Sequence, residues 1–301
     1  MNKILILGNG LVSYNLGMEF KKAGHEVALM ARSEKITDSE FKVFYSEITK
    51  QKLRDIIIEF KPAIVINGIG YKDVKACESE RVLALQSNVL IVQEIIDALL
   101  TSLTVPGHFF HLSTDYVFDG NPDPNSSCGY GVGVVPQPKL FYSHTKVMAE
   151  TLVKSASCLT RQKTKFIIIR TGGLFGYNSP LINSLVSDLT SMKKFHTYIN
   201  VINSPTSFSF LCESIIEMAK NIDYNAITHV SGKSLTRLEF CERVKTAFDL
   251  EGELIPTTNS NEIGDWHLPH DISLWSSVYR DTAGILTRLE PYKDHYLNRK
   301  G

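Results

Sequence analysis

The sequence predicts an α/β fold in which a doubly wound parallel sheet carries a smaller C-terminal lobe. Short apolar segments alternate with amphipathic ones over the first 170 residues. Strands buried in a parallel sheet are almost continuously apolar, whereas the helices between them show the longer helical period. The 301 residues are enough for one large domain with an appendage.

Five segments rich in Ile, Val and Phe are expected to be strands, at 3–7, 27–31, 64–67, 108–113 and 165–170. The amphipathic segments between them are expected to be helices, at about 11–23, 50–60, 79–102 and 142–156. After Arg170 the alternation weakens. A strand near 198–202 and a helix near 207–221 are candidates for a return to the main sheet.

The composition argues against several classes of protein. The formal net charge is zero, so nothing indicates a surface for nucleic acid or an anionic membrane. No apolar run approaches the ~20 residues of a membrane span, and the N-terminus does not read as a signal peptide. The 5 cysteines contain no CxxC pair. We therefore expect no disulfide framework, no metal site and a cytoplasmic location.

A glycine-rich turn follows the first expected strand. Gly8 permits a tight turn, and Gly10 allows a pyrophosphate to approach the backbone N–H groups of Leu11 and Val12 at a helix N-terminus. An ordinary strand–helix turn is the alternative reading. The position before a helix favours a dinucleotide-binding Rossmann domain. We place this domain at 1–170 plus about 198–230, and a substrate-binding lobe at about 171–197 plus 231–301.

The end of the second expected strand favours NADP(H) over NAD(H). An NAD site usually has an acidic residue there, but this chain has Arg32 followed by Ser33. A guanidinium suits a 2′-phosphate. The third strand ends in Asn67, Gly68 and Ile69, small or short side chains where the cofactor would cross the sheet edge.

The candidate chemistry lies in a Tyr-x-x-x-Lys pair. The chain contains this pair three times, at Tyr71/Lys75, Tyr142/Lys146 and Tyr296/Lys300. Only the middle copy begins a helix downstream of a strand that ends in Ser-Thr. The spacing places both side chains on one helix face, where the ammonium would lower the pKa of the phenol and bind the nicotinamide ribose.

We therefore expect Tyr142 to act as the general acid in a carbonyl reduction and Lys146 to support it. Thr114 would hold the carbonyl oxygen. Ser113 would point to the opposite face of the strand. The long loop from Asp119 to Lys139 follows this strand at the sheet edge where α/β proteins bind ligands.

The chain resembles the extended short-chain dehydrogenase/reductase family, and within it the dTDP-4-dehydrorhamnose reductases. The stretches that carry the resemblance are Ser113–Gly120, Tyr142 with Lys146, Asn67–Glu78, Asn88, Arg170-Thr171 and Pro205-Thr206. Relatives usually have GxxGxxG, whereas the glycine motif here is one residue shorter and ends in Ser13.

The resemblance implies a catalytic triad of Thr114, Tyr142 and Lys146, with Asn88 as the residue that positions the lysine. It implies a nucleotide-sugar substrate under the second lobe. The residues then expected at the substrate are Asp115, Tyr116, Val117 and Thr171. His267 and His270 match a substrate-contacting loop only loosely, and a surface loop is the alternative.

The resulting hypothesis is an enzyme, an NADPH-dependent reductase of the C4 carbonyl of a nucleotide-linked 4-keto-6-deoxy sugar. Dehydration is disfavoured because Asp115-Tyr116, rather than Asp-Glu, follows the threonine. A 4-epimerase, a bifunctional epimerase/reductase and a non-catalytic NADP-binding subunit like that of methionine adenosyltransferase stay open. If the chain forms a homodimer, the helices near 79–102 and 142–156 are the candidate surface.

Overall fold

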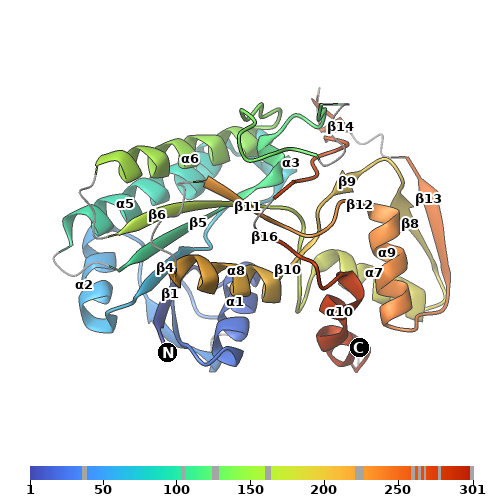
Figure 1. Ribbon diagram of the computed structural model, residues 1–301, viewed down its shortest axis with the longest axis horizontal. Coiled ribbons are helices and arrows are strands. Elements are labelled where there is room, and N and C mark those ends of the chain that lie inside the picture. Colours follow the sequence, from blue (N-terminus) through green and yellow to red (C-terminus); the bar gives the residue numbers. More distant parts are fainter. Residues whose placement is uncertain are drawn as a thin grey trace. The chain divides into compact units, whose positions relative to one another are not determined.

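In a computed structural model, the chain forms two compact units (Figure 1). The structure describes residues 1–35, 39–102, 106–123, 129–159, 164–220, 227–258, 262–263, 266–267, 269–276 and 279–298. The first unit comprises Met1–Val117, Pro138–Arg170 and Cys212–Thr228. The second comprises Phe118–Gln137, Thr171–Leu211 and His229–Gly301. The roles of these units as cofactor and substrate domains stay predictions.

The elements up to residue 171 are β1 Lys3–Leu7, α1 Leu11–Lys22, β2 Glu26–Ala31, β3 Lys42–Tyr45, α2 Lys50–Phe60, β4 Ile64–Asn67, α3 Val74–Ser79, α4 Arg81–Leu85, the π-helical turn η2 Gln86–Leu90, α5 Ile91–Thr101, β5 His108–Thr114, the 3₁₀ turn η3 Asp115–Val117, α6 Phe141–Leu159 and β6 Lys165–Thr171.

The later elements are β7 Leu174–Phe175, α7 Pro180–Thr190, β8 Lys194–Tyr198, β9 Ile202–Asn203, β10 Thr206–Ser207, α8 Phe208–Lys220, β11 Ile227–Ser231, β12 Leu235–Thr236, α9 Arg237–Ala247, β13 Glu253–Thr257, β14 Glu262–Ile263, β15 Trp266–His267, β16 Tyr279–Arg280, α10 Ile285–Leu289, η4 Glu290–Tyr292 and α11 Lys293–Leu297.

The main sheet has 8 strands in the order β16-β11-β6-β5-β4-β1-β2-β3. Strand β1 pairs in parallel with β2 on one side and with β4 on the other. The direction in which strands are added therefore reverses at β1. Such a switch point, at the carboxyl ends of the strands, is where doubly wound sheets bind ligands. The predicted doubly wound parallel sheet is confirmed.

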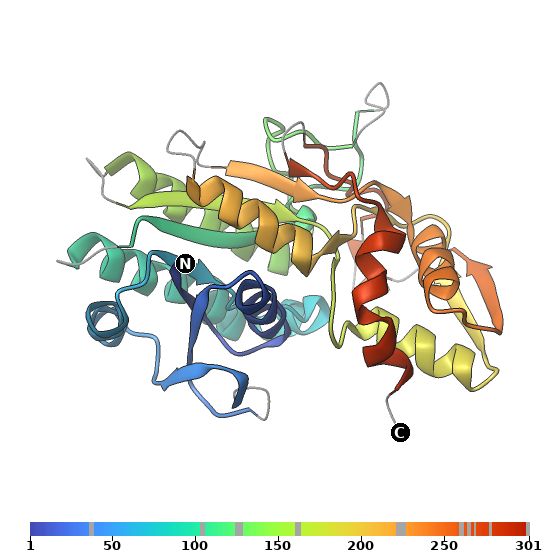
Figure 2. The ribbon, with the colours of Figure 1, turned by 60° about the horizontal axis from the view of Figure 1, so that its bottom comes forward.

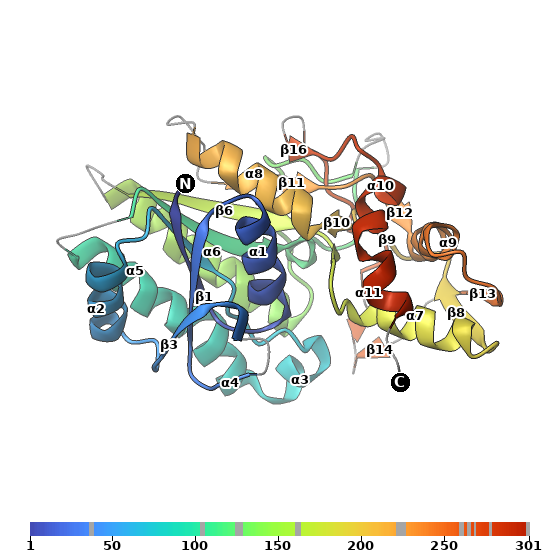
Figure 3. The same cartoon turned by 90° about the horizontal axis from the view of Figure 1, so that it is seen from below.

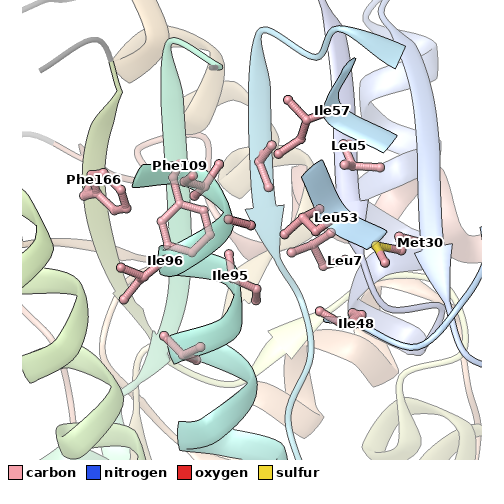
Figure 4. Close-up of a cluster of buried hydrophobic side chains, with 14 of the residues drawn as sticks. Leu5, Leu7, Met30, Ile48, Leu53, Ile57, Ile95, Ile96, Phe109 and Phe166 are labelled. Atoms are coloured by element: carbon pink, nitrogen blue, oxygen red, sulfur yellow. The ribbon is translucent and has the colours of Figure 1, made fainter. Parts of the chain in front are cut away.

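One face of the sheet packs against α2, α5 and α6. Figure 4 shows part of this core, in which Leu5 and Leu7 of β1 lie near Leu53 and Ile57 of α2. Alternate residues of β1 point to the opposite face, and Ile4 and Ile6 are fully buried there. Burial on both sides explains why β1 reads as a continuous apolar run.

The opposite face of the sheet is covered by α1 and α8 (Figures 2 and 3). Leu16 and Phe20 of α1 and Ile215 and Met218 of α8 are fully buried. The apolar period of both segments predicted these helices, because each buries one stripe and exposes the other.

All five expected strands form, but the expected return of residues 198–202 to the main sheet is wrong. Strand β8 pairs in parallel with β13, and β9 pairs with β12, in separate two-stranded sheets. The strand that joins the main sheet in this half of the chain is β11. Strand β3, at the sheet edge, was not expected because its four residues show no clear apolar period; two of them are exposed and two are partly buried.

The expected helix over 79–102 is interrupted by the π-helical turn Gln86–Leu90. By length and composition the helical stretch Arg81–Thr101 could span a membrane, with a mean hydropathy of 1.5. Its apolar side, however, packs into the core through Val92, Ile95 and Ile96. This packing accounts for the hydropathy as that of a core helix.

The second unit has its own apolar core, built from α7, α9 and the C-terminal segments. Leu185 and Val244 are fully buried there, together with Leu289. Helix α9 begins with a capping box in which Thr236 and Glu239 satisfy each other's backbone N–H groups. These residues lie in the region where the sequence pattern is least regular.

Candidate active site

The polar end of β5 brings together the first candidate residues. The Thr114 hydroxyl donates to Asp115 Oδ1 at 2.9 Å and accepts the Tyr116 backbone N–H at 3.2 Å. The rings of Tyr116 and Tyr142 are 6.4 Å apart, edge to face. The 3₁₀ turn Asp115–Val117 thus places Thr114 and Asp115 close to the phenol at the start of α6.

The pKa of Tyr142 is raised above its usual value, mainly by burial and then by the charge of Asp115. A hydrogen bond with Thr114 acts in the opposite direction. The decrease in the pKa of Tyr142 that was expected from the charge of Lys146 is not found. Tyr142 therefore holds its proton at neutral pH, as a proton donor must.

Asp115 is buried, and burial raises the pKa of its carboxyl group to about 7. Hydrogen bonds from Thr114 and from backbone N–H groups only partly offset this effect. Its Oδ2 atom has no hydrogen-bond partner among the described residues. A buried polar atom of this kind is expected to meet a ligand or a water.

Lys146 is buried beneath the strand end, on the same face of α6 as Tyr142. Its Nζ atom donates to the Leu112 carbonyl oxygen at 2.7 Å and lies 3.5 Å from His111 Nε2. Burial lowers the pKa of Lys146 to about 8, although the charge of Glu150 raises it. The two strand residues thus hold the lysine under the end of β5.

Ser113 joins a buried ion pair, and its expected orientation away from Thr114 stays a prediction. Arg170 Nη2 lies 2.7 Å from Glu150 Oε2, with side chains only 2% and 5% exposed. The Ser113 hydroxyl donates to Glu150 Oε1 at 2.5 Å. Arg170 of β6 and Ser113 of β5 therefore tie α6 to two strands of the sheet.

Asn88, in the π-helical turn, binds the chain on both sides of the site. Its Oδ1 accepts the Tyr71 N–H at 2.7 Å, and its Nδ2 donates to Thr145 Oγ1 at 2.9 Å. The Asn88 amide thus binds Thr145, the residue before Lys146 in α6. No hydrogen bond joins Asn88 to Lys146 among the described residues. Glu78 accepts the Phe141 N–H at 2.7 Å, which places a carboxylate at the N-terminus of α6.

The glycine turn between β1 and α1 is an open cradle. Gly8 has φ of +100°, and a Cβ on Gly10 would meet nothing within 4 Å. The N-cap of α1, Gly10, has no side-chain capping bond. The N-terminus of α1 therefore offers its backbone N–H groups to an anion, as a pyrophosphate site requires.

Close packing explains why the residue that follows β4, Gly68, is a glycine. A Cβ on Gly68 would lie 2.6 Å from Ser13 Oγ and 3.2 Å from the Leu7 carbonyl oxygen. Asn67 precedes it, and its Oδ1 accepts the Ile69 backbone N–H at 3.1 Å. The ends of β1 and β4 can approach each other only because Gly68 has no side chain.

Cationic side chains follow the ends of β2 and β4. Arg32 and Ser33 come directly after β2, and Asn9 donates to the Ser33 carbonyl oxygen at 2.6 Å. Burial and then the charge of Lys35 lower the pKa of Lys72. A bound anion would reduce the electrostatic repulsion between these two ammonium groups.

The structure separates the three Tyr-x-x-x-Lys copies. The Tyr71 hydroxyl donates to Glu80 at 2.7 Å, which raises its pKa to about 12. The Tyr296 hydroxyl donates to the Gly176 carbonyl oxygen at 2.6 Å inside the second unit's core. Among the described residues, Tyr142 is the one of the three tyrosines that contacts Thr114 and is influenced by Asp115. Lys300 of the third copy lies outside the described residues.

In the second unit, the loop after Phe118 packs against the segment that contains His270. Gly120 has φ of +85°, and a Cβ there would lie 2.7 Å from Pro269 Cβ. The Tyr130 N–H donates to the Ser273 carbonyl oxygen at 2.8 Å. His270 is exposed, and the side chain of His267 lies outside the described residues.

Thr171, at the end of β6, is buried, and its hydroxyl has no hydrogen-bond partner among the residues that the structure describes. Val117, the last residue of the first of three segments that form the first unit, is fully buried. The assignments of Thr171, Val117 and Tyr116 to substrate binding stay predictions. Sequence reasoning missed His111, Glu150 and the part that Glu78 has in capping α6. The only available signal was polar residues in otherwise apolar segments.

The sequence model of the RmlD substrate binding domain matches residues 1–285. The chain belongs to this family. A relative, the spore coat polysaccharide biosynthesis protein SpsK of Bacillus subtilis, is 26% identical over 292 residues, 96% of this chain and 94% of its own. The dTDP-4-dehydrorhamnose reductase of Aggregatibacter actinomycetemcomitans is 28% identical over 174 residues, 58% of this chain and 55% of its own.

Among solved structures, the dTDP-4-dehydrorhamnose reductase of Bacillus anthracis in complex with NADP shares the fold. Its TM-score is 0.70 at 20% identity, covering 92% of this chain and 91% of that one. Other neighbours have different activities. The UDP-glucose 4-epimerase of Thermotoga maritima has a TM-score of 0.80 at 12% identity, over 98% of both chains. By sequence, methionine adenosyltransferase 2 subunit beta of Danio rerio is a further relative, 23% identical over 264 residues, 82% of this chain and 75% of its own.

Proposed function

We propose that the protein is a reductase that transfers a hydride from NADPH to the C4 carbonyl of a nucleotide-linked 4-keto-6-deoxy sugar. The observation that carries the proposal is the placing of the Tyr142 phenol beside Thr114 and Asp115, with Lys146 one helical turn further along α6. Membership in a family that includes dTDP-4-dehydrorhamnose reductases supports this substrate class.

The chain's own groups can supply the proton. A bound nicotinamide cofactor would supply the hydride. The raised pKa keeps Tyr142 protonated at neutral pH, so its hydroxyl can donate to the oxygen on which negative charge develops. The Thr114 hydroxyl accepts the Tyr116 N–H and here donates its one proton to Asp115 Oδ1; turned toward the substrate, the same proton would be donated to that oxygen.

The cofactor would lie across the ends of β1, β2 and β4. The open turn at Gly8 and Gly10 fits a pyrophosphate. Arg32, directly after β2, favours the additional 2′-phosphate of NADP(H). The charges of Lys35 and Lys72, which act on each other, add to the positive potential that would attract an anion. Asn67, Ile69 and Asn88 are further candidates along the same edge, and Lys146 would bind the nicotinamide ribose.

The test is NADPH oxidation with a panel of 4-keto-6-deoxy nucleotide sugars, using Tyr142→Phe as the decisive variant. We expect NADPH binding to persist while the chemical step falls by ~10²-fold or more, the usual scale for loss of a general acid. Tyr71→Phe is the matched control, because its hydroxyl binds only Glu80 in a recorded contact. An unchanged rate in Tyr142→Phe would overturn the assignment.

A non-catalytic NADP-binding subunit is the second candidate, because the methionine adenosyltransferase subunit aligns with 82% of this chain. NADPH binding without turnover of any sugar in the panel would favour it. Interconversion of nucleotide sugars that differ only in the configuration of the C4 hydroxyl, without net NADPH oxidation, would favour an epimerase. We also propose a soluble cytoplasmic location, which cell fractionation tests. A homodimer through α4–α6 is a further proposal, which light scattering tests.

A further inference from the structure

A buried hydrogen-bond chain runs from the cofactor edge of β4 to the lysine of α6. It passes from the Ile69 backbone through Asn67 and His111 to Lys146. All four residues belong to the first unit. Asn67 and His111 are each only 1% exposed, so bulk water does not compete for these bonds.

The direction of each bond follows from the groups at its ends. A backbone N–H can only donate, so the Ile69 N–H at 3.1 Å identifies the accepting end of the Asn67 amide as Oδ1. The other end, Nδ2, therefore donates to His111 Nδ1 at 3.1 Å. His111 Nδ1 must then carry a lone pair.

His111 is neutral, because burial and then the charge of Lys146 lower its pKa well below the usual value. A neutral imidazole has one N–H. Since Nδ1 accepts, the proton is on Nε2, which lies 3.5 Å from Lys146 Nζ. An ammonium has three donors and no acceptor, so it meets this N–H unfavourably, whereas an amine accepts it.

We propose that Asn67 fixes His111 as the Nε2–H tautomer, and that His111 is thereby a positioning residue that favours the amine form of Lys146. The tautomer of His111 is independent of the proposed function. Only the catalytic role of Lys146 rests on it. An amine can still donate to the Leu112 carbonyl oxygen at 2.7 Å. Lys146 would then exchange a proton near neutral pH, although a typical lysine does not.

Other titratable groups set limits on the effect. Glu150 of α6 acts on the lysine directly, and Arg170 of β6 is paired with Glu150. Asp115 and Cys77 act on Tyr142, one helical turn from the lysine on α6. Glu150 favours the ammonium, but its carboxylate is shared with Arg170 and Ser113. Variants must therefore change the tautomer without disturbing this ion pair.

Asn67→Asp is the required variant. A carboxylate has nearly the shape of the amide and can still accept the Ile69 N–H, but it cannot donate to His111 Nδ1. The proton should move to Nδ1, which leaves a lone pair on Nε2 facing Lys146. The pKa of Lys146 should then rise by about one unit or more.

The tautomer is measured from long-range ¹H–¹⁵N spectra of histidine-labelled full-length protein, with His111→Phe to assign the signal. The titration of Lys146 is followed through its ¹³Cε signal in lysine-labelled protein, assigned with Lys146→Met. We expect protonation at Nε2 in the unmodified protein and at Nδ1 in Asn67→Asp. The midpoint of the Lys146 titration should move upward only in the second.

The added charge of Asn67→Asp is separated from the tautomer by the same substitution in the His111→Phe background. An equal upward shift of Lys146 there would show that the charge alone acts, and would overturn the proposal. So would an Nδ1–H or doubly protonated His111 in the unmodified protein at pH 7. These spectra need no turnover, so failure of the sugar panel would refute the reductase assignment without deciding the tautomer.

Discussion

The buried ion pair behind the site is expected to carry a large share of the stability of the first unit. Arg170 Nε and Nη2 donate to both Glu150 oxygens at 2.7–3.2 Å, and both side chains are almost completely buried. For charges about 4 Å apart, an effective dielectric of about 20 gives about 4 kcal/mol of attraction. Arg170→Met removes this attraction and leaves a carboxylate buried with only the Ser113 hydroxyl as a recorded partner.

We expect Arg170→Met to lower the free energy of unfolding by about 3–5 kcal/mol, measured by urea denaturation followed by circular dichroism. The matched control is Lys42→Met in the same unit. Lys42 lies 2.9 Å from Glu59, but these side chains are 54% and 61% exposed. An exposed pair contributes about 0–1 kcal/mol, because water screens the charges.

A second substitution separates the charge from the packing. Glu150→Gln in the Arg170→Met background removes the isolated carboxylate, and should recover about 1 kcal/mol or more of the loss. If Arg170→Met lowers stability no more than Lys42→Met, or if Glu150→Gln recovers nothing, the burial argument is wrong.

Three further predictions test the site. Arg32→Ala should raise the dissociation constant for NADPH by about 10-fold or more and leave that for NADH nearly unchanged, as measured by binding titrations. Equal effects on the two cofactors would contradict the assignment of Arg32 to the 2′-phosphate. Asp115 has a folded pKa of about 7, above its ordinary value of 3.8, so the folded state binds the extra proton. Stability should fall by up to about 4 kcal/mol as pH rises from 4 to 7, and Asp115→Asn should abolish this slope in denaturation at each pH. Gly120→Ala should destabilise the second unit by about 2 kcal/mol or more, because φ is +85° and Pro269 lies in the way, whereas Gly131→Ala, with open space, should be nearly neutral in thermal melts.

Much of the first unit could be predicted from local patterns. The strands β1 and β4 are apolar except at one end, and β5 carries a run of buried aromatic and aliphatic residues, because both faces of the sheet are covered. This burial leaves a direct trace in the sequence. The glycine turn and the Ser113-Thr114 strand end are also local. The order of these motifs along the chain was enough to place Thr114, Tyr142 and Lys146 at one edge of a doubly wound sheet.

The short strands of the second half could not be predicted in the same way. Strand β9 has only two residues and pairs with β12 more than thirty residues later in the chain. So short a segment has no period to read, and its partner is set by packing rather than by its own residues. The π-helical turn that carries Asn88 lies inside a helical pattern with no local break signal.

The sequence alone determined which residue types meet at the end of β5, because parallel strands bring their carboxyl ends to one edge. The tertiary structure decided their protonation. Burial raises the pKa of Tyr142 where the lysine spacing predicted a lower one, and the chain from Asn67 through His111 reaches Lys146 over sequence separations that no local pattern encodes. A pKa depends on everything that surrounds a group in space, and spacing along the chain reports only one neighbour.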